Sequence, residues 1–198
     1  MLKKIISISG LFLVASLLFL SFYLSARVPN LTEAIDFTLK DYNDKSYTLS
    51  EEKDAKAVVV MFWSAECPNV QAYNGRIVKI VENYSSKGII FWAINSNTTE
   101  NTQQIKSHAQ EYSYNFPVLV DPNSAVADKF SASKTPEVFV LDKDRNIIYH
   151  GRIDNSKDES KVKTHDLTNA LDEILAGKEV TVKETKSFGC TIKRKQGN

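Results

Sequence analysis

The chain has 198 residues and a formal net charge of +1 at pH 7, because 25 Lys and Arg side chains nearly balance 24 Asp and Glu. A chain this close to neutral has no overall field to attract nucleic acid, and the basic residues 193–195 are too few to do so alone. About 170 residues follow the N-terminal segment, enough for one domain with a full core. We therefore expect one folded domain and no nucleic-acid partner.

The N-terminal segment is predicted to be a targeting element. Lys3 and Lys4 precede an uncharged, mainly apolar run over residues 5–24. About 20 apolar residues can cross a bilayer, whereas the core of a cleavable signal peptide is usually shorter. We expect residues 1–28 to form an uncleaved signal anchor, with a cleaved signal peptide as the alternative. Because lysines favour the cytoplasmic side, the domain should lie outside the cytoplasm, in the periplasm if the organism is bacterial.

The elements predicted after residue 35 begin with strands. Residues 37–39 and 46–49 flank a turn and predict a hairpin. Next comes a strand, helix and strand unit over residues 57–63, 68–86 and 89–95. Because such a connection is a right-handed crossover, we expect its two strands to be parallel.

The second half of the domain continues this alternation. The predicted elements are a helix from a cap at residues 98–99 to Tyr112, a strand over 117–120, a helical turn over 122–130, an antiparallel hairpin over 137–141 and 147–153, and a helix from Ser160 to Ala176. Gly177 should end that last helix. The sequence thus predicts an α/β fold in residues 29–178, with a central mixed sheet and helices on both faces. A tail over residues 179–198 follows.

Cys67 stands at the junction between a buried strand and a helix. The unpaired amides and dipole of a helix start favour the thiolate, which is the nucleophilic form, and Pro68 suits the first helical position. Glu66 acts in the opposite direction, because a nearby carboxylate raises the pKa of a thiol. A buried, unreactive thiol is the alternative interpretation of Cys67.

Several motifs resemble one known superfamily. They are residues 62–68 with Glu66-Cys67-Pro68, the strand over 89–95, and Lys134-Thr135-Pro136 ahead of the strand over 138–142. Residues 35–176 resemble the thioredoxin-like superfamily, and within it the redoxins of the alkyl hydroperoxide reductase and thiol-specific antioxidant type. The segments 93–97, 151–154 and 189–193 are similar to a peroxiredoxin-like subgroup of thioredoxin-family redoxins.

The resemblance implies a thioredoxin-like fold and a thiol-based oxidoreductase that needs no cofactor. In the family, the proline that matches Pro136 is cis and faces the active cysteine, and the preceding backbone, here Thr135, pairs with an incoming substrate chain. Trp63 would lie partly in the core and partly at the rim of the substrate groove. Ser64 or a backbone amide would donate a hydrogen bond to the thiolate of Cys67.

The chain departs from both groups of relatives at their functional positions. Val70 stands where thioredoxins have a second cysteine, and Met61 stands where they keep a buried aspartate. Val60 and Pro136 stand where peroxiredoxins have a proline and an arginine, and only Ser64 matches the hydroxyl of the peroxidase motif. Neither set of catalytic residues is therefore complete.

Cys190 is the other cysteine of the chain. With Val70 in the usual partner position, Cys190 is the only other thiol of the sequence, so its functional interpretation is a cysteine that resolves an intermediate formed on Cys67. An unpaired tail thiol and a static structural disulfide are the alternatives. Two cysteines suit an oxidising compartment, where thiols can pair or cycle.

The expected function is an exported or membrane-anchored thiol-disulfide oxidoreductase. Its partners would be a protein or small-molecule thiol or disulfide substrate, an external thiol reductant, and the membrane through residues 5–24. A thiol-dependent peroxidase and a non-catalytic thioredoxin-fold binding module are the alternative functions.

Other candidates for chemistry give weaker signals. His108, His150 and His165 are scattered over a helix, a strand and a helix start, so we expect packed or solvated imidazoles and no metal site. Arg76 lies too far along its helix to touch the thiol, and we expect it at the surface. Trp92 is expected in the core.

Overall fold

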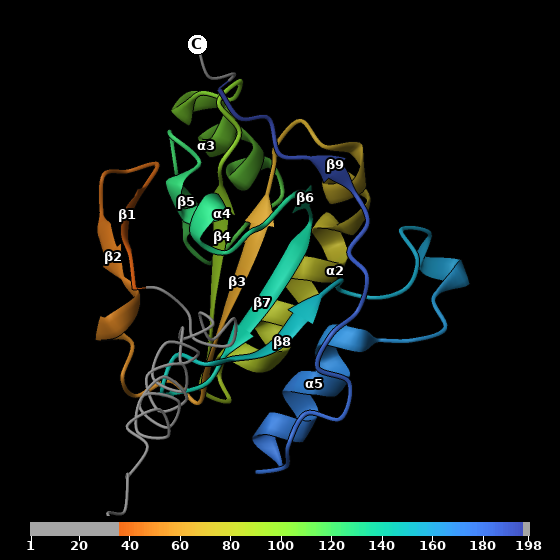
Figure 1. The fold of residues 1–198 in the computed structure, drawn as a ribbon. Coiled ribbons are helices and arrows are strands. Elements are labelled where there is room, and N and C mark those ends of the chain that lie inside the picture. The colour runs from red at the N-terminus through yellow and green to blue at the C-terminus, as the bar shows by residue number, and fades with distance from the viewer. Residues whose placement is uncertain (1–35, 196–198) are drawn as a thin grey trace, which may run out of the picture. The chain divides into compact units, whose positions relative to one another are not determined.

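The computed structural model describes residues 36–195, and Figure 1 shows their arrangement. The predicted apolar helix and membrane anchor over residues 5–24 lie outside this range. Among the residues that are described, no helix is both long and apolar enough to cross a membrane.

A seven-stranded mixed sheet forms the centre of the fold, in the order β2-β1-β5-β4-β3-β7-β8. Its strands are β1 (Thr38–Asp41), β2 (Ser46–Thr48), β3 (Ala57–Trp63), β4 (Ile89–Asn95), β5 (Val118–Val120), β7 (Glu137–Leu141) and β8 (Ile147–Gly151). The central strand β3 is parallel to β4 and antiparallel to β7. The predicted parallel pair and both predicted hairpins are confirmed.

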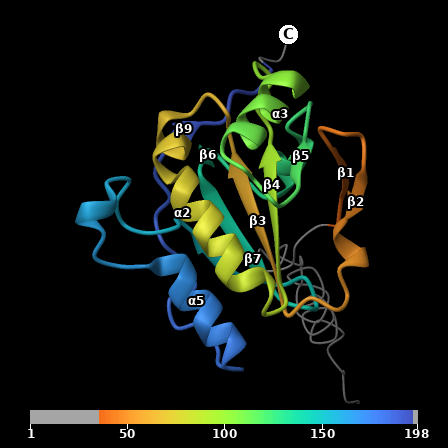
Figure 2. The ribbon, with the colours of Figure 1, turned by 180° about the vertical axis from the view of Figure 1, so that it is seen from behind.

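Helices cover both faces of the sheet, as expected. They are α2 (Pro68–Ser85), α3 (Thr102–Glu111), α4 (Ala125–Lys129), α5 (Asp166–Leu175) and the 3-10 helices η1 (Leu49–Glu51) and η2 (Glu159–Lys161). One hydrophobic cluster joins α2, α3 and α5 to Val59, Met61 and Trp63, and Figure 2 shows α2 and α5 lying across this face. The opposite cluster joins α4 and η1 to Val58 and Phe62. Because both faces are covered, every residue of β3 is buried.

The last predicted helix is divided in the structure. Instead of one helix from Ser160, η2 and α5 are separated by extended chain. The side-chain oxygen of Asn155 accepts hydrogen bonds from the backbone amides of Lys163 and Thr164 at 2.7 and 3.0 Å, which holds this segment out of helical geometry. Gly177, with φ +69°, ends α5 as predicted.

The start of α3 also differs from the prediction. Its cap is Asn101 rather than residues 98–99. The Asn101 side chain accepts from the Gln104 amide at 2.9 Å, and the Gln104 side chain accepts from the Asn101 amide at 2.8 Å. This reciprocal capping box satisfies two otherwise unpaired amides.

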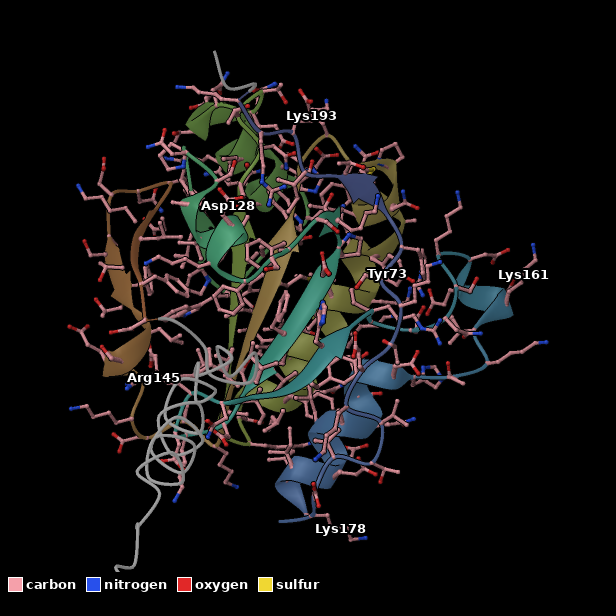
Figure 3. The ribbon with its side chains drawn as sticks, in the orientation of Figure 1. Tyr73, Asp128, Arg145, Lys161, Lys178 and Lys193 are labelled. Atoms are coloured by element: carbon pink, nitrogen blue, oxygen red, sulfur yellow. A yellow bond between two sulfur atoms is a disulfide. The ribbon has the colours of Figure 1, made fainter. Side chains whose placement is uncertain are left out.

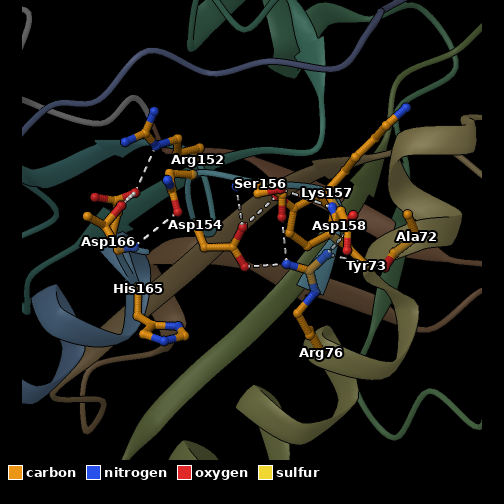
Figure 4. A network of polar contacts seen from close by, with 12 residues as sticks. Ala72, Tyr73, Arg76, Arg152, Asp154, Ser156, Lys157, Asp158, His165 and Asp166 are labelled. Atoms are coloured by element: carbon orange, nitrogen blue, oxygen red, sulfur yellow. Dashed lines mark hydrogen bonds and ion pairs between the residues drawn. The ribbon is translucent and has the colours of Figure 1, made fainter. Parts of the chain in front are cut away.

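Arg76 is buried, so the surface position expected for it is wrong. Its guanidinium binds the buried Asp154 carboxylate and donates to the carbonyl oxygens of Ser156 and Lys157 (Figure 4). Tyr73 also donates to Asp154, at 2.7 Å. This cluster ties the loop after β8 to α2, the helix that begins beside Cys67. Lys161, at the end of η2, differs from Arg76 in that its side chain is exposed and projects away from the sheet (Figure 3).

The tail after α5 runs back along the sheet. The backbone of His150 in β8 accepts from the Thr185 amide at 3.0 Å and donates to the Lys183 carbonyl at 2.9 Å. Further on, β9 (Cys190–Thr191) pairs antiparallel with β6 (Lys134–Thr135) as a separate two-stranded sheet. Figure 1 shows this path from α5 past β8 to β9. The tail therefore returns Cys190 to the end of the sheet where α2 begins.

Candidate redox site

Cys67 occupies the position that the sequence predicts. Strand β3 ends at Trp63, a short turn follows, and Cys67 is the N-cap of α2 with Pro68 at the start of the helix. Cys67 is only 2% exposed. The free amides and dipole of the helix start therefore act on a sulfur that is largely removed from water, which strengthens their effect on a thiolate.

Cys67 and Cys190 form a disulfide. Their Cα atoms lie 5.9 Å apart, although 123 positions separate them in the sequence. The alternative of an unpaired tail thiol for Cys190 therefore does not hold. Val70, at the position where thioredoxins have their second cysteine, is fully buried in the same hydrophobic cluster as Cys67.

The peptide bond between Thr135 and Pro136 is cis, as the resemblance implied. The carbonyl oxygen of Thr135 lies 3.1 Å from the sulfur of Cys67. A disulfide sulfur carries no proton, but the thiol formed on reduction can donate a hydrogen bond to this oxygen. The cis-proline loop and the start of α2 thus face each other across the cysteine.

The protein's own tail fills the strand position beside the cis-proline. Thr135 pairs in register with Cys190, and Lys134 pairs with Thr191. A Cβ atom on Gly189 would lie 2.1 Å from the Thr135 carbonyl oxygen, so only glycine fits so close to this backbone. The backbone that was expected to bind an incoming chain is paired with residues of the same molecule.

Contacts beyond Cys190 hold the tail without the disulfide. Ile192 is buried, and its amide donates to the Ser133 carbonyl at 3.1 Å. The amide of Lys193 donates to the Asn97 side chain at 2.9 Å. Arg194 pairs with Asp128 at 2.7 Å. These contacts are additional to the disulfide and do not involve either sulfur.

Glu137 links the cis-proline loop to the tail and to β8. One carboxylate oxygen accepts from the amides of Ser133 and Lys134 at 2.7 and 2.9 Å, and the other accepts from His150 at 2.8 Å and Ser187 at 3.4 Å. Burial acts to raise the pKa of Glu137, but the hydrogen bond from His150 and those from the two amides outweigh it, so the pKa is lowered. The ionised carboxylate is the form that supports this loop.

Glu100 is a site residue that sequence reasoning missed. Its carboxylate accepts from the Ser64 hydroxyl, from the Ala65 amide at 2.7 Å and from the Asn95 side chain at 2.7 Å. Of the two donors expected for the Cys67 thiolate, Ser64 or a backbone amide, the Ser64 hydroxyl is bound to Glu100 instead. The position of Glu100 after the carboxyl end of a parallel strand, where α/β folds place their sites, is a signal that could have indicated it.

Trp63 lies in the core and does not reach the rim of a groove, since it is 0% exposed. Its indole donates to the Tyr114 hydroxyl at 3.1 Å, and that hydroxyl donates to the Asn74 side chain at 2.6 Å. Asn74 also contacts the His108 ring at 3.1 Å. Burial lowers the pKa of His108, so the neutral ring is favoured. This buried polar network lies in the core next to the turn that precedes Cys67.

The polar side chains closest to the disulfide contact the tail. Glu66 is exposed and meets the Lys193 ammonium at 3.4 Å and the Gln104 amide at 3.3 Å. Asn69, a second residue that sequence reasoning missed, places its side-chain nitrogen 3.5 Å from the Cys190 sulfur. Glu66 thus connects the tail, through Lys193, to α3, through Gln104.

The sheet order, the cysteine at the start of α2 and the cis-proline opposite it define a thioredoxin-like redoxin. A model of the AhpC/TSA family matches residues 31–150, and the chain belongs to this family.

The chain is also similar to individual proteins. The thiol-disulfide oxidoreductase ResA of Halalkalibacterium halodurans is 25% identical over 116 residues, which cover 59% of this chain and 64% of that protein, or just under two thirds of its length. A hypothetical protein of Sinorhizobium meliloti 1021 is 34% identical with a TM-score of 0.78, over 84% of this chain and 94% of the other. An uncharacterized conserved protein of Geobacillus kaustophilus is 31% identical with a TM-score of 0.78, over 84% and 92% of the two chains.

Proposed function

We propose that this protein is a thiol-disulfide oxidoreductase in which Cys67 is the nucleophile and Cys190 is the resolving thiol. The observation that carries the proposal is the disulfide between a cysteine at the start of α2 and a tail cysteine held opposite cis-Pro136. The similarity to proteins named thiol-disulfide oxidoreductase ResA supports the same class of reaction.

The reaction is two successive thiol-disulfide exchanges. The Cys67 thiolate attacks one sulfur of a substrate disulfide, forms a mixed disulfide with it, and releases the other substrate sulfur as a thiolate. The Cys190 thiolate then attacks the Cys67 sulfur, which forms the internal disulfide and releases the first substrate sulfur. Two electrons pass from the cysteine pair to the substrate. An external thiol reductant returns them by the reverse exchanges.

Each group around Cys67 has a role in this scheme. The free amides and dipole at the start of α2 stabilise the thiolate, both as attacking group and as leaving group. The Thr135 carbonyl oxygen, 3.1 Å away, accepts a hydrogen bond from the Cys67 thiol when the sulfur is protonated. Glu100 fixes the turn before the cysteine through Ser64 and Ala65. Cys190 replaces the neighbouring second cysteine of thioredoxins.

The location of the enzyme is part of the proposal. Residues 5–24 would tether the domain to the membrane with Cys67 and Cys190 outside the cytoplasm. A disulfide persists more readily in an oxidising compartment, which favours this location. Fractionation of cells that express the full chain, followed by protease treatment of intact spheroplasts, tests it; a protease-resistant soluble protein contradicts it.

Substitution of each cysteine tests the activity. Cys67→Ser should abolish turnover of a model disulfide, because no nucleophile remains. Cys190→Ser should instead stop after one exchange and accumulate a mixed disulfide on Cys67, visible by mass spectrometry. Unchanged turnover in Cys67→Ser would refute the proposal, and unchanged turnover in Cys190→Ser would remove the resolving role alone.

A further inference from the structure

We infer that the substrate of Cys67 is an extended protein segment whose disulfide cysteine follows a glycine and precedes, by two residues, an aliphatic side chain. The inference rests on the proposed function and identifies its substrate class. It comes from the tail, which occupies the strand position beside Thr135 in the way a bound peptide would.

Access to Cys67 defines where a substrate must lie. With the tail in place Cys67 is only 2% exposed, and Cys190 covers its sulfur. The Thr135 carbonyl oxygen approaches that sulfur from the cis-proline loop. A substrate sulfur can therefore reach Cys67 only after the tail moves away, and the space that opens is the strand position beside β6. A chain that binds there contacts the same residues that the tail contacts.

The residue before the substrate cysteine takes the place of Gly189. A Cβ atom at this position would lie 2.1 Å from the Thr135 carbonyl oxygen, 2.7 Å from the carbonyl carbon and 3.3 Å from the Pro136 nitrogen. All three are backbone atoms of the loop that Glu137 holds through two amides, so they cannot turn aside as a flexible side chain would. A chain that follows the backbone path of Gly189, whose φ is +157°, has room only for glycine at this position, so this path favours glycine before the substrate cysteine.

The residues after the substrate cysteine alternate between solvent and core. Thr191 is exposed, so the first position imposes little selection. Ile192 is 3% exposed and belongs to the hydrophobic cluster that contains Phe62 and Phe130. A strand places alternate side chains on opposite faces, so the second residue after any cysteine in this register enters the same cluster. An aliphatic side chain gains burial there, and a polar one loses its hydration.

Lys193, which follows Ile192, contributes less to selection. The Lys193 ammonium reaches Glu66 at 3.4 Å, but both side chains are largely exposed. Exposed ion pairs are weak, so a positive charge at this position is not a requirement. The predicted pattern is therefore glycine, cysteine, any residue and an aliphatic residue, in a segment that can extend as a strand.

The test measures how fast Cys67 reacts with peptides that differ at these positions. The protein is the full chain with Cys190→Ser, and the reduced wild-type chain is the second form in case the variant is poorly folded. The peptides have the sequence of residues 186–194, with their cysteine carrying thionitrobenzoate as the leaving thiol. One has alanine in place of glycine before the cysteine, and another has serine in place of isoleucine. Free glutathione, reacted with each peptide, corrects for intrinsic reactivity.

The parent peptide should release thionitrobenzoate at least about tenfold faster than either altered peptide, a ratio worth about 1.4 kcal/mol. Every peptide must displace the same tail, so the cost of displacing it does not change the ratio of the rates for two peptides. Corrected rates within about twofold of one another would overturn the inference. Equal but rapid rates would leave the proposed function intact. Failure of both protein forms to react with any peptide or with a small aromatic disulfide would overturn the inference and the proposed function together.

Discussion

Cys190 is the register partner of Thr135, so the resolving cysteine sits on the backbone that precedes cis-Pro136. This pairing positions the Cys190 sulfur over Cys67 through main-chain geometry as well as through the covalent bond. The main-chain pairing and the covalent bond thus place the two sulfurs at the same point of the fold.

Gly189→Ala should weaken the internal disulfide, because the added methyl group would collide with the Thr135 carbonyl. We expect the equilibrium constant of the disulfide against glutathione to fall at least about tenfold. Gly75→Ala is the matched control, since a Cβ atom there meets nothing within 4 Å. That change should stabilise α2 by about 0.5 to 1 kcal/mol and leave the disulfide constant unchanged. If the wild type and both variants had the same disulfide equilibrium constant, the close approach of Gly189 to the Thr135 carbonyl would be contradicted.

Reduction should destabilise the domain without unfolding it. A disulfide between residues 123 positions apart stabilises nominally by about 4 to 5 kcal/mol in the chain-entropy model. The tail keeps its contacts through Ile192 and Arg194, so the reduced protein should remain folded in buffer. Urea unfolding of oxidised and reduced protein measures the difference, and Cys67→Ser with Cys190→Ser should match the reduced form. Identical midpoints for oxidised and reduced protein would show that the disulfide adds no stability.

Arg76→Met should be strongly destabilising, because it leaves the Asp154 carboxylate buried without its cationic partner. Loss of one member of a buried ion pair costs about 3 to 5 kcal/mol. Lys161→Met is the matched control: its pair with Asp158 is exposed, and its loss should change stability by at most about 0.5 kcal/mol. Denaturant unfolding gives both values, and similar small effects would mean that Arg76 is dispensable.

Glu137 should make stability depend on pH in the acid range. Its pKa is lowered from the ordinary value of 4.5 in the folded state, so its contribution is fully present above that value and is lost as the pH falls through the folded pKa. Glu137→Gln should therefore be less stable than the wild type at pH 7, and the difference should shrink below about pH 4.5. Urea unfolding over pH 7 to 3 tests this, and a difference independent of pH would count against it.

The elements predicted most accurately are those whose signal is local. The strands β3 and β4 match the predicted ranges 57–63 and 89–95 residue for residue, because buried parallel strands are continuous apolar runs. The position of Cys67 at the start of α2 was equally clear, since Pro68 marks the first turn of a helix. The family motifs also indicated the cis bond before Pro136.

The parts that could not be predicted depend on contacts between distant residues. The position of Glu100 after β4 could indicate a site residue, but its pairing with Ser64 could not be predicted, because 36 positions separate the two residues in the sequence. The burial of Arg76 depends in the same way on a loop more than 70 positions later. The strand made by Cys190 is only two residues long, too short to leave a periodic pattern.

The tail also protects the sheet from other molecules. The last strand in the order, β8, would otherwise present a row of free amides and carbonyls, which is a template for aggregation. The pairing of His150 with Lys183 and Thr185 occupies part of that row. Within residues 36–195, the opposite margin is the three-residue β2, which is too short to recruit a foreign strand easily. The segment that brings Cys190 to its partner thus also shields the domain against self-association.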